Sequence, residues 1–172
     1  MTDYRLLEEQ VRGLLSDESD PIANAANFAA LVYGEIPDVS WAGFYYADPE
    51  GELVLGPFQG RPACARLPKG RGVCGAAFLR REILVVDDVS QFADHIACDS
   101  AARSEIVVPL VVDNSAYGVF DLDSALLRRF IPDDQRGIES LVKTFVSLTP
   151  RPKRNEKESL PFGKNPVRKT PR

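Results

Sequence analysis

Residues 105–124 (EIVVPLVVDNSAYGVFDLDS) contain two apolar runs joined by the polar tripeptide Asp113-Asn114-Ser115. Apolar and β-branched runs on both sides of a short polar turn are typical of a β-hairpin. Residues 39–58 repeat the pattern, because VSWAGFYYA and ELVLGPF flank the turn sequence DPEG. Two hairpins in one chain predict an antiparallel sheet whose apolar face must be covered by other elements.

Helices are predicted at both ends of the chain, and they can cover the apolar face of the sheet. Residues 3–17 carry apolar side chains at helical spacing, at Leu6, Leu7, Val11, Leu14 and Leu15. Residues 19–36 predict a second helix, with Asp20 as the N-cap before Pro21. Residues 131–148 predict a third helix with a proline in its first turn.

The segment between the two hairpins, residues 60–104, is rich in glycine and loops. It contains Cys64 in a short extended piece, then KGRGVCGAAF, in which Cys74 opens a short helix. The strand EILVVDDV and a loop with one helical turn, SQFADHIACDSAARS, complete it. This order predicts an α+β fold with a central antiparallel sheet, helices on one face and a loop-covered pocket on the other.

The length of 172 residues suits one domain, but its charge is unevenly distributed. Residues 149–172 contain eight Lys or Arg, two Glu and five prolines, a net charge of +6. Because the whole chain carries −4, residues 1–148 carry −10. We predict a folded domain over residues 1–148 and a disordered, basic, proline-rich tail over residues 149–172. The acidic body argues against a nucleic-acid partner.

The sequence also bears on where the protein works. Its longest apolar runs, such as IVVPLVV, are far too short to span a membrane. The N-terminus MTDYRLLEEQ lacks the basic and then apolar regions of a secretory signal. We therefore expect a cytoplasmic protein without a membrane partner.

Three cysteines, Cys64, Cys74 and Cys98, are too few for a disulfide framework. No two of them form a CxxC pair, and the single histidine, His95, cannot complete the usual zinc set, so we expect no metal. Two interpretations remain: buried packing residues, or redox chemistry. The second gains weight because all three lie in polar, glycine-rich or loop segments, where functional residues concentrate.

Carboxylates gather at the end of the second hairpin. Asp121 and Asp123 are two residues apart on a predicted strand, so their side chains share one side of the sheet. Glu105 begins the neighbouring strand and is placed to join them. A solvated strand end would explain these acids equally well.

Aromatic residues on the first hairpin favour a binding site instead. Trp41 and Tyr45 are four residues apart on a strand and share one face, with Gly43 between them leaving space. An aromatic floor beside clustered carboxylates suits a small amphiphilic molecule that carries an ammonium group.

Several segments together resemble the free methionine-(R)-sulfoxide reductases, which are single GAF domains. They are WAGFYY, LGPFQGRPACARLPKGRGVCGAA, HIACDS, SEIVVPL and GVFDLDS, within residues 27–145. The resemblance implies a GAF-type fold, a possible homodimer, and reduction of free L-methionine-(R)-sulfoxide to methionine with thioredoxin as external reductant and no cofactor. It places the redox cysteines at Cys64, Cys74 and Cys98, and the substrate pocket at Trp41, Tyr45, Glu105, Asp121 and Asp123. FADHIACD departs from the phenylalanine-proline-glycine lead-in common in the family, and the basic tail is a second departure.

Sulfoxide reduction needs a thiolate nucleophile, a proton donor and a resolving thiol. We expect Cys98 to attack and Cys74 or Cys64 to resolve the sulfenic acid as a disulfide. Cys74 is the rival nucleophile, because a helix N-terminus would lower its thiol pKa. One carboxylic acid would protonate the sulfoxide oxygen and the others would bind the ammonium, with their individual roles open. Backbone N–H groups of the glycine-rich or CDSA loop would bind the substrate carboxylate.

Two other functions stay open at this point. A non-catalytic GAF sensor would bind a small ligand and pass a signal to an output domain. A thiol redox switch would act on a partner protein and would need no pocket of carboxylates and aromatic rings.

Overall fold

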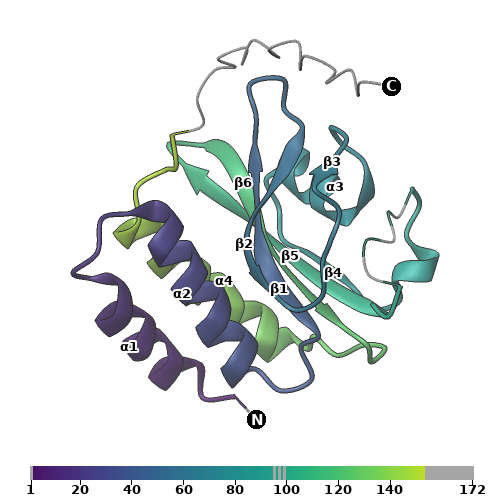
Figure 1. The fold of residues 1–172 in the computed structure, drawn as a ribbon. Helices are drawn as coiled ribbons and strands as arrows, with labels where there is room; N and C mark the ends of the chain where they lie inside the picture. The colour runs from purple at the N-terminus through teal and green to yellow at the C-terminus, as the bar shows by residue number, and fades with distance from the viewer. Residues whose placement is uncertain (1, 95, 97, 99, 154–172) are drawn as a thin grey trace, which may run out of the picture.

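The two predicted hairpins lie side by side at the centre of the sheet. The structure is a computed structural model that describes residues 2–94, 96, 98 and 100–153. Its six described strands form one antiparallel sheet in the order β3-β2-β1-β6-β5-β4 (Figure 1). The first hairpin consists of β1 (Trp41–Ala47) and β2 (Leu53–Gln59), and the second of β5 (Ser104–Val112) and β6 (Ser115–Ser124). They join through the β1–β6 pair, so the predicted α+β architecture is confirmed.

The edges of the sheet differ from the sequence prediction. β4 (Leu84–Val86) keeps only three residues of the strand expected over 82–89. The Asp88 side chain accepts a hydrogen bond from the Ser90 N–H and caps a single 3-10 turn, η1 (Val89–Gln91), which replaces the end of the expected strand. At the other edge, β3 (Arg66–Leu67) pairs with β2 and has no counterpart among the predicted strands.

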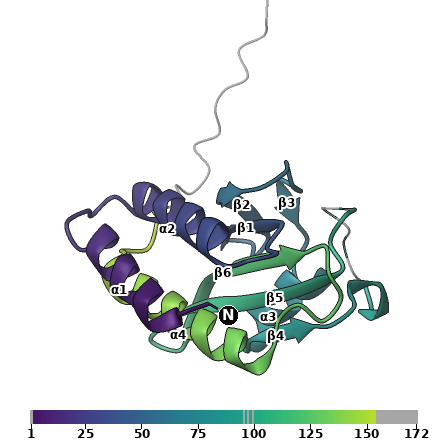
Figure 2. The same ribbon diagram turned by 90° about the horizontal axis from the view of Figure 1, so that it is seen from below.

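Helix α1 (Tyr4–Leu15) packs against α2 (Pro21–Glu35) and α4 (Pro132–Leu148), and the latter two cover one face of the sheet (Figure 2). Asp3 and Asp20 start the first two, since their side chains accept hydrogen bonds from the unpaired N–H groups of the first turn. The helix layer and sheet enclose a core in which aromatic rings meet at centroid distances of 4.7 to 5.8 Å: Phe28, Phe44, Phe120 and Phe145.

The opposite face of the sheet is covered by α3 (Gly72–Arg80) and the loop-rich segments around it. Pairing between β1 and β6 sets Trp41 opposite Asp123 and Gly43 opposite Asp121. Pairing between β5 and β6 sets Glu105 opposite Asp123. Because side chains alternate along a strand, these residues all point to the α3 face, as the sequence predicts.

The chain beyond α4 stays in contact with the domain for a few residues. Thr149 is buried and its hydroxyl accepts a hydrogen bond from the Asn24 amide at 3.2 Å. The Arg151 guanidinium donates to the Val112 carbonyl at 2.9 Å and lies over the Tyr117 ring. The rest of the predicted tail, residues 154–172, lies outside the described residues, so its disorder stays a prediction.

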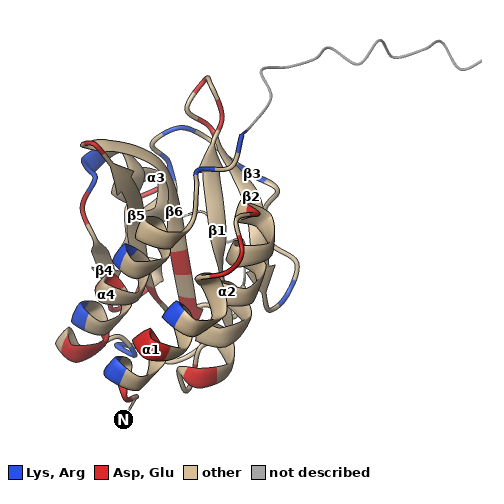
Figure 3. Ribbon diagram, turned by 90° about the vertical axis from the view of Figure 1, so that its left-hand side faces the viewer, with Lys and Arg blue, Asp and Glu red and all other residues tan. Residues whose placement is uncertain are grey.

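The exposed side of the helix layer carries charges of both signs rather than a basic stripe (Figure 3). Many of them are paired at the surface, as in Arg12 with Glu8 and Lys143 with Glu139. Within the described parts of the chain, no helix has the length and apolar character needed to cross a bilayer.

Candidate active site

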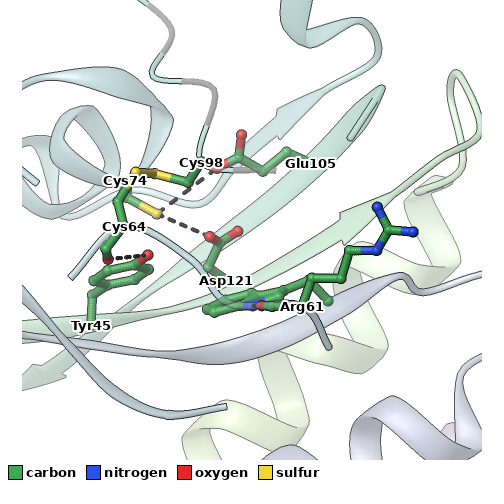
Figure 4. The surroundings of a disulfide bond; sticks show 8 residues. Tyr45, Arg61, Cys64, Cys74, Cys98, Glu105 and Asp121 are labelled. Carbon is green, nitrogen blue, oxygen red and sulfur yellow. Dashed lines mark hydrogen bonds between the residues drawn. A yellow bond between two sulfur atoms is a disulfide. The ribbon is translucent and has the colours of Figure 1, made fainter. Parts of the chain in front are cut away.

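A small cavity lies between the sheet and α3, and most of the predicted site residues line it. Its volume is about 30 Å³. Seven of the eight predicted residues contribute to its wall: Trp41, Tyr45, Cys74, Cys98, Glu105, Asp121 and Asp123. Cys64 is the exception; it is bonded to Cys98, which does line the cavity (Figure 4).

The disulfide between Cys64 and Cys98 joins two loop segments that are 34 residues apart in the sequence. Their Cα atoms are 5.2 Å apart, within the ordinary range for a disulfide. The Tyr45 hydroxyl donates a hydrogen bond of 3.0 Å to the Cys64 carbonyl, which ties this segment to β1. His95 and Asp99, which flank Cys98 in the sequence motif, lie outside the described residues.

Cys74 has a different environment from the one its sequence context indicates. It is the third residue of α3, a free thiol that is only 4% exposed. Close packing explains this burial, since a side chain at Gly75 would come within 2.8 Å of the Gly70 backbone. Burial first, and then the charges of Asp121 and Glu105, raise the Cys74 pKa well above its ordinary value. The pKa lowering expected from the helix N-terminus is therefore wrong, because burial and like charge outweigh the helix dipole.

The Cys74 thiol touches both buried carboxyl groups (Figure 4). Its Sγ lies 3.3 Å from Asp121 Oδ2 and 3.8 Å from Glu105 Oε1. Both carboxyl groups are 6% exposed. Within the described part of the chain, the other Asp121 oxygen, Oδ1, is buried without a hydrogen-bond partner.

Burial also changes the acidity of these two carboxyl groups. It raises the pKa of Asp121 to about 7, and burial together with the Asp121 charge raises the pKa of Glu105 well above its ordinary value. A charged carboxylate loses its hydration in such a place, so the neutral acid is favoured. The cluster therefore retains protons near neutral pH, and it can release them to a bound molecule.

Stacked aromatic rings form the floor of the cavity. The Trp41 ring stacks on Tyr45 at 5.9 Å and on Phe58 at 5.5 Å, and its indole N–H donates to the Arg61 carbonyl at 3.1 Å. The space expected above Gly43 is not open. A Cβ there would lie 2.4 Å from Phe58 Cβ and 2.6 Å from the Trp41 ring, so the missing side chain makes room for this stack.

Some residues of the cavity wall were not predicted from the sequence. Ala63, Ile96 and Ala102 supply apolar surface from the loops, where no periodicity indicates their direction. Arg71 also lines the cavity, and its guanidinium lies 3.6 Å from Asp94. Its position between the two glycines of GRG, just before a predicted helix, is the signal that could have identified it.

Comparisons with known proteins agree with this geometry. Residues 20–147 match the GAF domain family. The chain is 47% identical to free methionine-R-sulfoxide reductase of Escherichia coli over 81% of this chain and 84% of that protein. It is 38% identical to the Saccharomyces cerevisiae protein of the same name over 76% of this chain and 77% of that one.

A solved structure of another free methionine-R-sulfoxide reductase is also similar to this chain. The free methionine-R-sulfoxide reductase of Neisseria meningitidis, in complex with its substrate, superposes with a TM-score of 0.80 at 45% identity. The superposition covers 84% of this chain and 86% of that one. The chain is a GAF-domain protein, and it belongs to the family of the free methionine-R-sulfoxide reductases.

Proposed function

We propose that this protein reduces free L-methionine-(R)-sulfoxide to L-methionine with its own cysteine thiols. The observation that carries the proposal is the disulfide-forming pair Cys64 and Cys98 at the wall of a cavity that buried acids and aromatic rings also line. The reductases of the same family support the substrate, because one of them is solved with its substrate bound.

The chemistry begins at Cys98, the member of the pair that faces the cavity. Its thiolate attacks the sulfoxide sulfur while the sulfoxide oxygen takes up a proton. Methionine leaves, and the oxygen stays on Cys98 as a sulfenic acid. The Cys64 thiol then attacks the Cys98 sulfur, a water molecule leaves, and the disulfide forms. An external dithiol restores both thiols by disulfide exchange, and thioredoxin in the cytosol is the reductant we propose.

Glu105 and Asp121 serve as the proton donors of this reaction. Burial raises the pKa of Glu105 well above its ordinary value and that of Asp121 to about 7, so both favour the protonated form that donates to the sulfoxide oxygen. Asp123 lies opposite both Glu105 and Trp41 in the sheet register and binds the substrate ammonium. The Trp41 and Tyr45 rings receive the methyl group and select the epimer by shape.

The disulfide state described here is the product state of the catalytic cycle. Its cavity of about 30 Å³ holds a water or two, since one water needs roughly 10–15 Å³, and it is too small for an amino acid. Reduction cuts the link between the Cys64 and Cys98 segments. Their separation then opens the cavity for the next substrate.

Turnover of the free R epimer with thioredoxin tests the proposal directly. The free S epimer and a peptide-bound sulfoxide are the matched controls, because the peptide bond removes the ammonium. Cys98→Ser should abolish turnover and keep substrate binding. Cys64→Ser should leave a sulfenic acid on Cys98 that a dimedone-type reagent traps. Absence of turnover with the free R epimer would refute the proposal, and substrate binding without turnover would favour the GAF sensor instead.

A further inference from the structure

We propose that Cys74, Glu105 and Asp121 form a binding site for a single zinc ion. The sequence lacks the cysteine and histidine spacing of a structural zinc site. The fold, however, brings one thiol and two carboxyl groups together from α3, β5 and β6. One ligand atom from each of the three residues lies within 4.8 Å of the others.

The two distances from the Cys74 sulfur to the carboxylate oxygens fit tetrahedral zinc. Zinc binds thiolate sulfur at about 2.3 Å and carboxylate oxygen at about 2.0–2.2 Å. In a tetrahedron these lengths place sulfur and oxygen about 3.5 Å apart. The observed distances from Cys74 Sγ are 3.3 Å to Asp121 Oδ2 and 3.8 Å to Glu105 Oε1, on either side of that value. Side-chain rotations that bring the two carboxylate oxygens, which lie within 4.8 Å of each other, to about 3.4 Å would complete the geometry.

A second observation points to a cationic ligand. Asp121 is 6% exposed, and its Oδ1 has no hydrogen-bond partner among the described residues. Its carboxylate points toward the Cys74 thiol and lies on the same side as Glu105 (Figure 4). A buried, unpartnered oxygen is costly unless a ligand satisfies it. The adjoining cavity of about 30 Å³ leaves room for a water as the fourth zinc ligand.

Zinc binding at this site would release protons from the Cys74 thiol and from the two carboxyl groups. The thiol and carboxyl groups must lose their protons to bind the metal. Zinc binding changes no oxidation state, so it needs no oxidant or reductant. The site does not require the Cys64 and Cys98 thiols, so it exists in the disulfide state. If the proposed function is correct, zinc would also occupy the two carboxyl groups that donate protons to the substrate, Glu105 and Asp121, and inhibit turnover. The binding itself does not depend on that function.

Cobalt(II) as a spectroscopic substitute for zinc tests the site without any activity measurement. The protein with Cys64 and Cys98 oxidised to the disulfide has Cys74 as its only free thiol. One equivalent of cobalt should give a near-ultraviolet thiolate-to-cobalt band, and one equivalent of zinc should remove it. The double variant Cys64→Ser/Cys98→Ser should give the same band.

Single substitutions then assign the ligands. Cys74→Ser should abolish the band. Asp121→Asn and Glu105→Gln should each weaken zinc affinity at least about tenfold, the lower end of what loss of even an outer-shell partner costs. Asp94→Asn is the matched control and should change nothing, because that exposed carboxylate lies outside the cluster. Circular dichroism verifies that each variant is folded.

Two results would overturn the zinc site. One is the absence of a thiolate band in both the oxidised protein and the double variant. The other is unchanged zinc affinity in folded Asp121→Asn and Glu105→Gln proteins, which would place the ion elsewhere. Turnover of methionine sulfoxide, measured separately without added metal, decides on the proposed function alone.

Discussion

Asp121→Asn should make the protein more stable at alkaline pH. The wild-type carboxyl group is buried beside Glu105 and Cys74, and burial raises its pKa from 3.8 to about 7. The carboxyl group has a higher pKa in the folded protein than in the unfolded chain. Its contribution to stability is therefore fully present at a pH below the unfolded pKa, and it is lost as the pH rises through the folded pKa. The asparagine amide stays neutral, so the variant avoids that loss.

The size of the effect follows from the two pKa values. Each pKa unit corresponds to about 1.4 kcal/mol, so the interval from 3.8 to about 7 corresponds to about 4 kcal/mol. A poorer hydrogen bond with the Cys74 thiol costs about 1 kcal/mol. We therefore expect the variant to be about 3 kcal/mol more stable than the wild type at pH 8.5. The gain should shrink steadily toward pH 4.

Urea unfolding at several pH values between 5 and 8.5 measures this difference in the free energy of unfolding. Asp94→Asn is the control, since it removes one exposed carboxylate and leaves the buried cluster unchanged. A stability difference between Asp121→Asn and wild type that does not vary with pH would show that Asp121 does not hold a proton in the folded protein. A less stable variant at pH 8.5 would show the same.

Three further substitutions test the packing around the site and between the helices. Gly43→Ala should raise KM or abolish turnover, because its methyl group collides with the stacked Trp41 ring; unchanged kinetics would contradict the described floor. Gly137→Ala should lower stability by about 1–3 kcal/mol in thermal unfolding, since its methyl group meets the Tyr4 ring at 2.1 to 2.4 Å. The same change at Gly34, where nothing lies within 4 Å, should instead raise stability by up to about 1 kcal/mol.

The side of the sheet on which each site residue lies could be predicted from the sequence. Side chains alternate along a strand, so Asp121 and Asp123 could be assigned to one face, and Trp41 and Tyr45 to one face, from their spacing alone. Their neighbours in space follow from strand pairing, and the two hairpins limited that pairing to few arrangements. The resemblance to a known family supplied the GAF-type fold, whereas the order of the strands comes from the structure.

The environment of Cys74 could not be predicted in the same way. Its glycine-rich context at the start of a predicted short helix left open whether the thiol is buried, whereas in the structure the same glycines let α3 approach the loop backbone closely and bury it. The disulfide partner of Cys98 and the filled space at Gly43 depend equally on contacts between distant segments. Local patterns contain no information about such contacts, because they form only when the chain is folded.

Strand β1 serves both faces of the sheet. Phe44 faces the helix core, while Trp41 and Tyr45 face the cavity. A one-residue insertion or deletion within β1 would exchange these faces. The Trp41 indole would then point toward the helices, and the Phe44 ring would leave the helix core. The strands of related chains should therefore keep their length. Length differences should instead accumulate in the turn at residues 48–51, which lies outside both the helix core and the cavity wall.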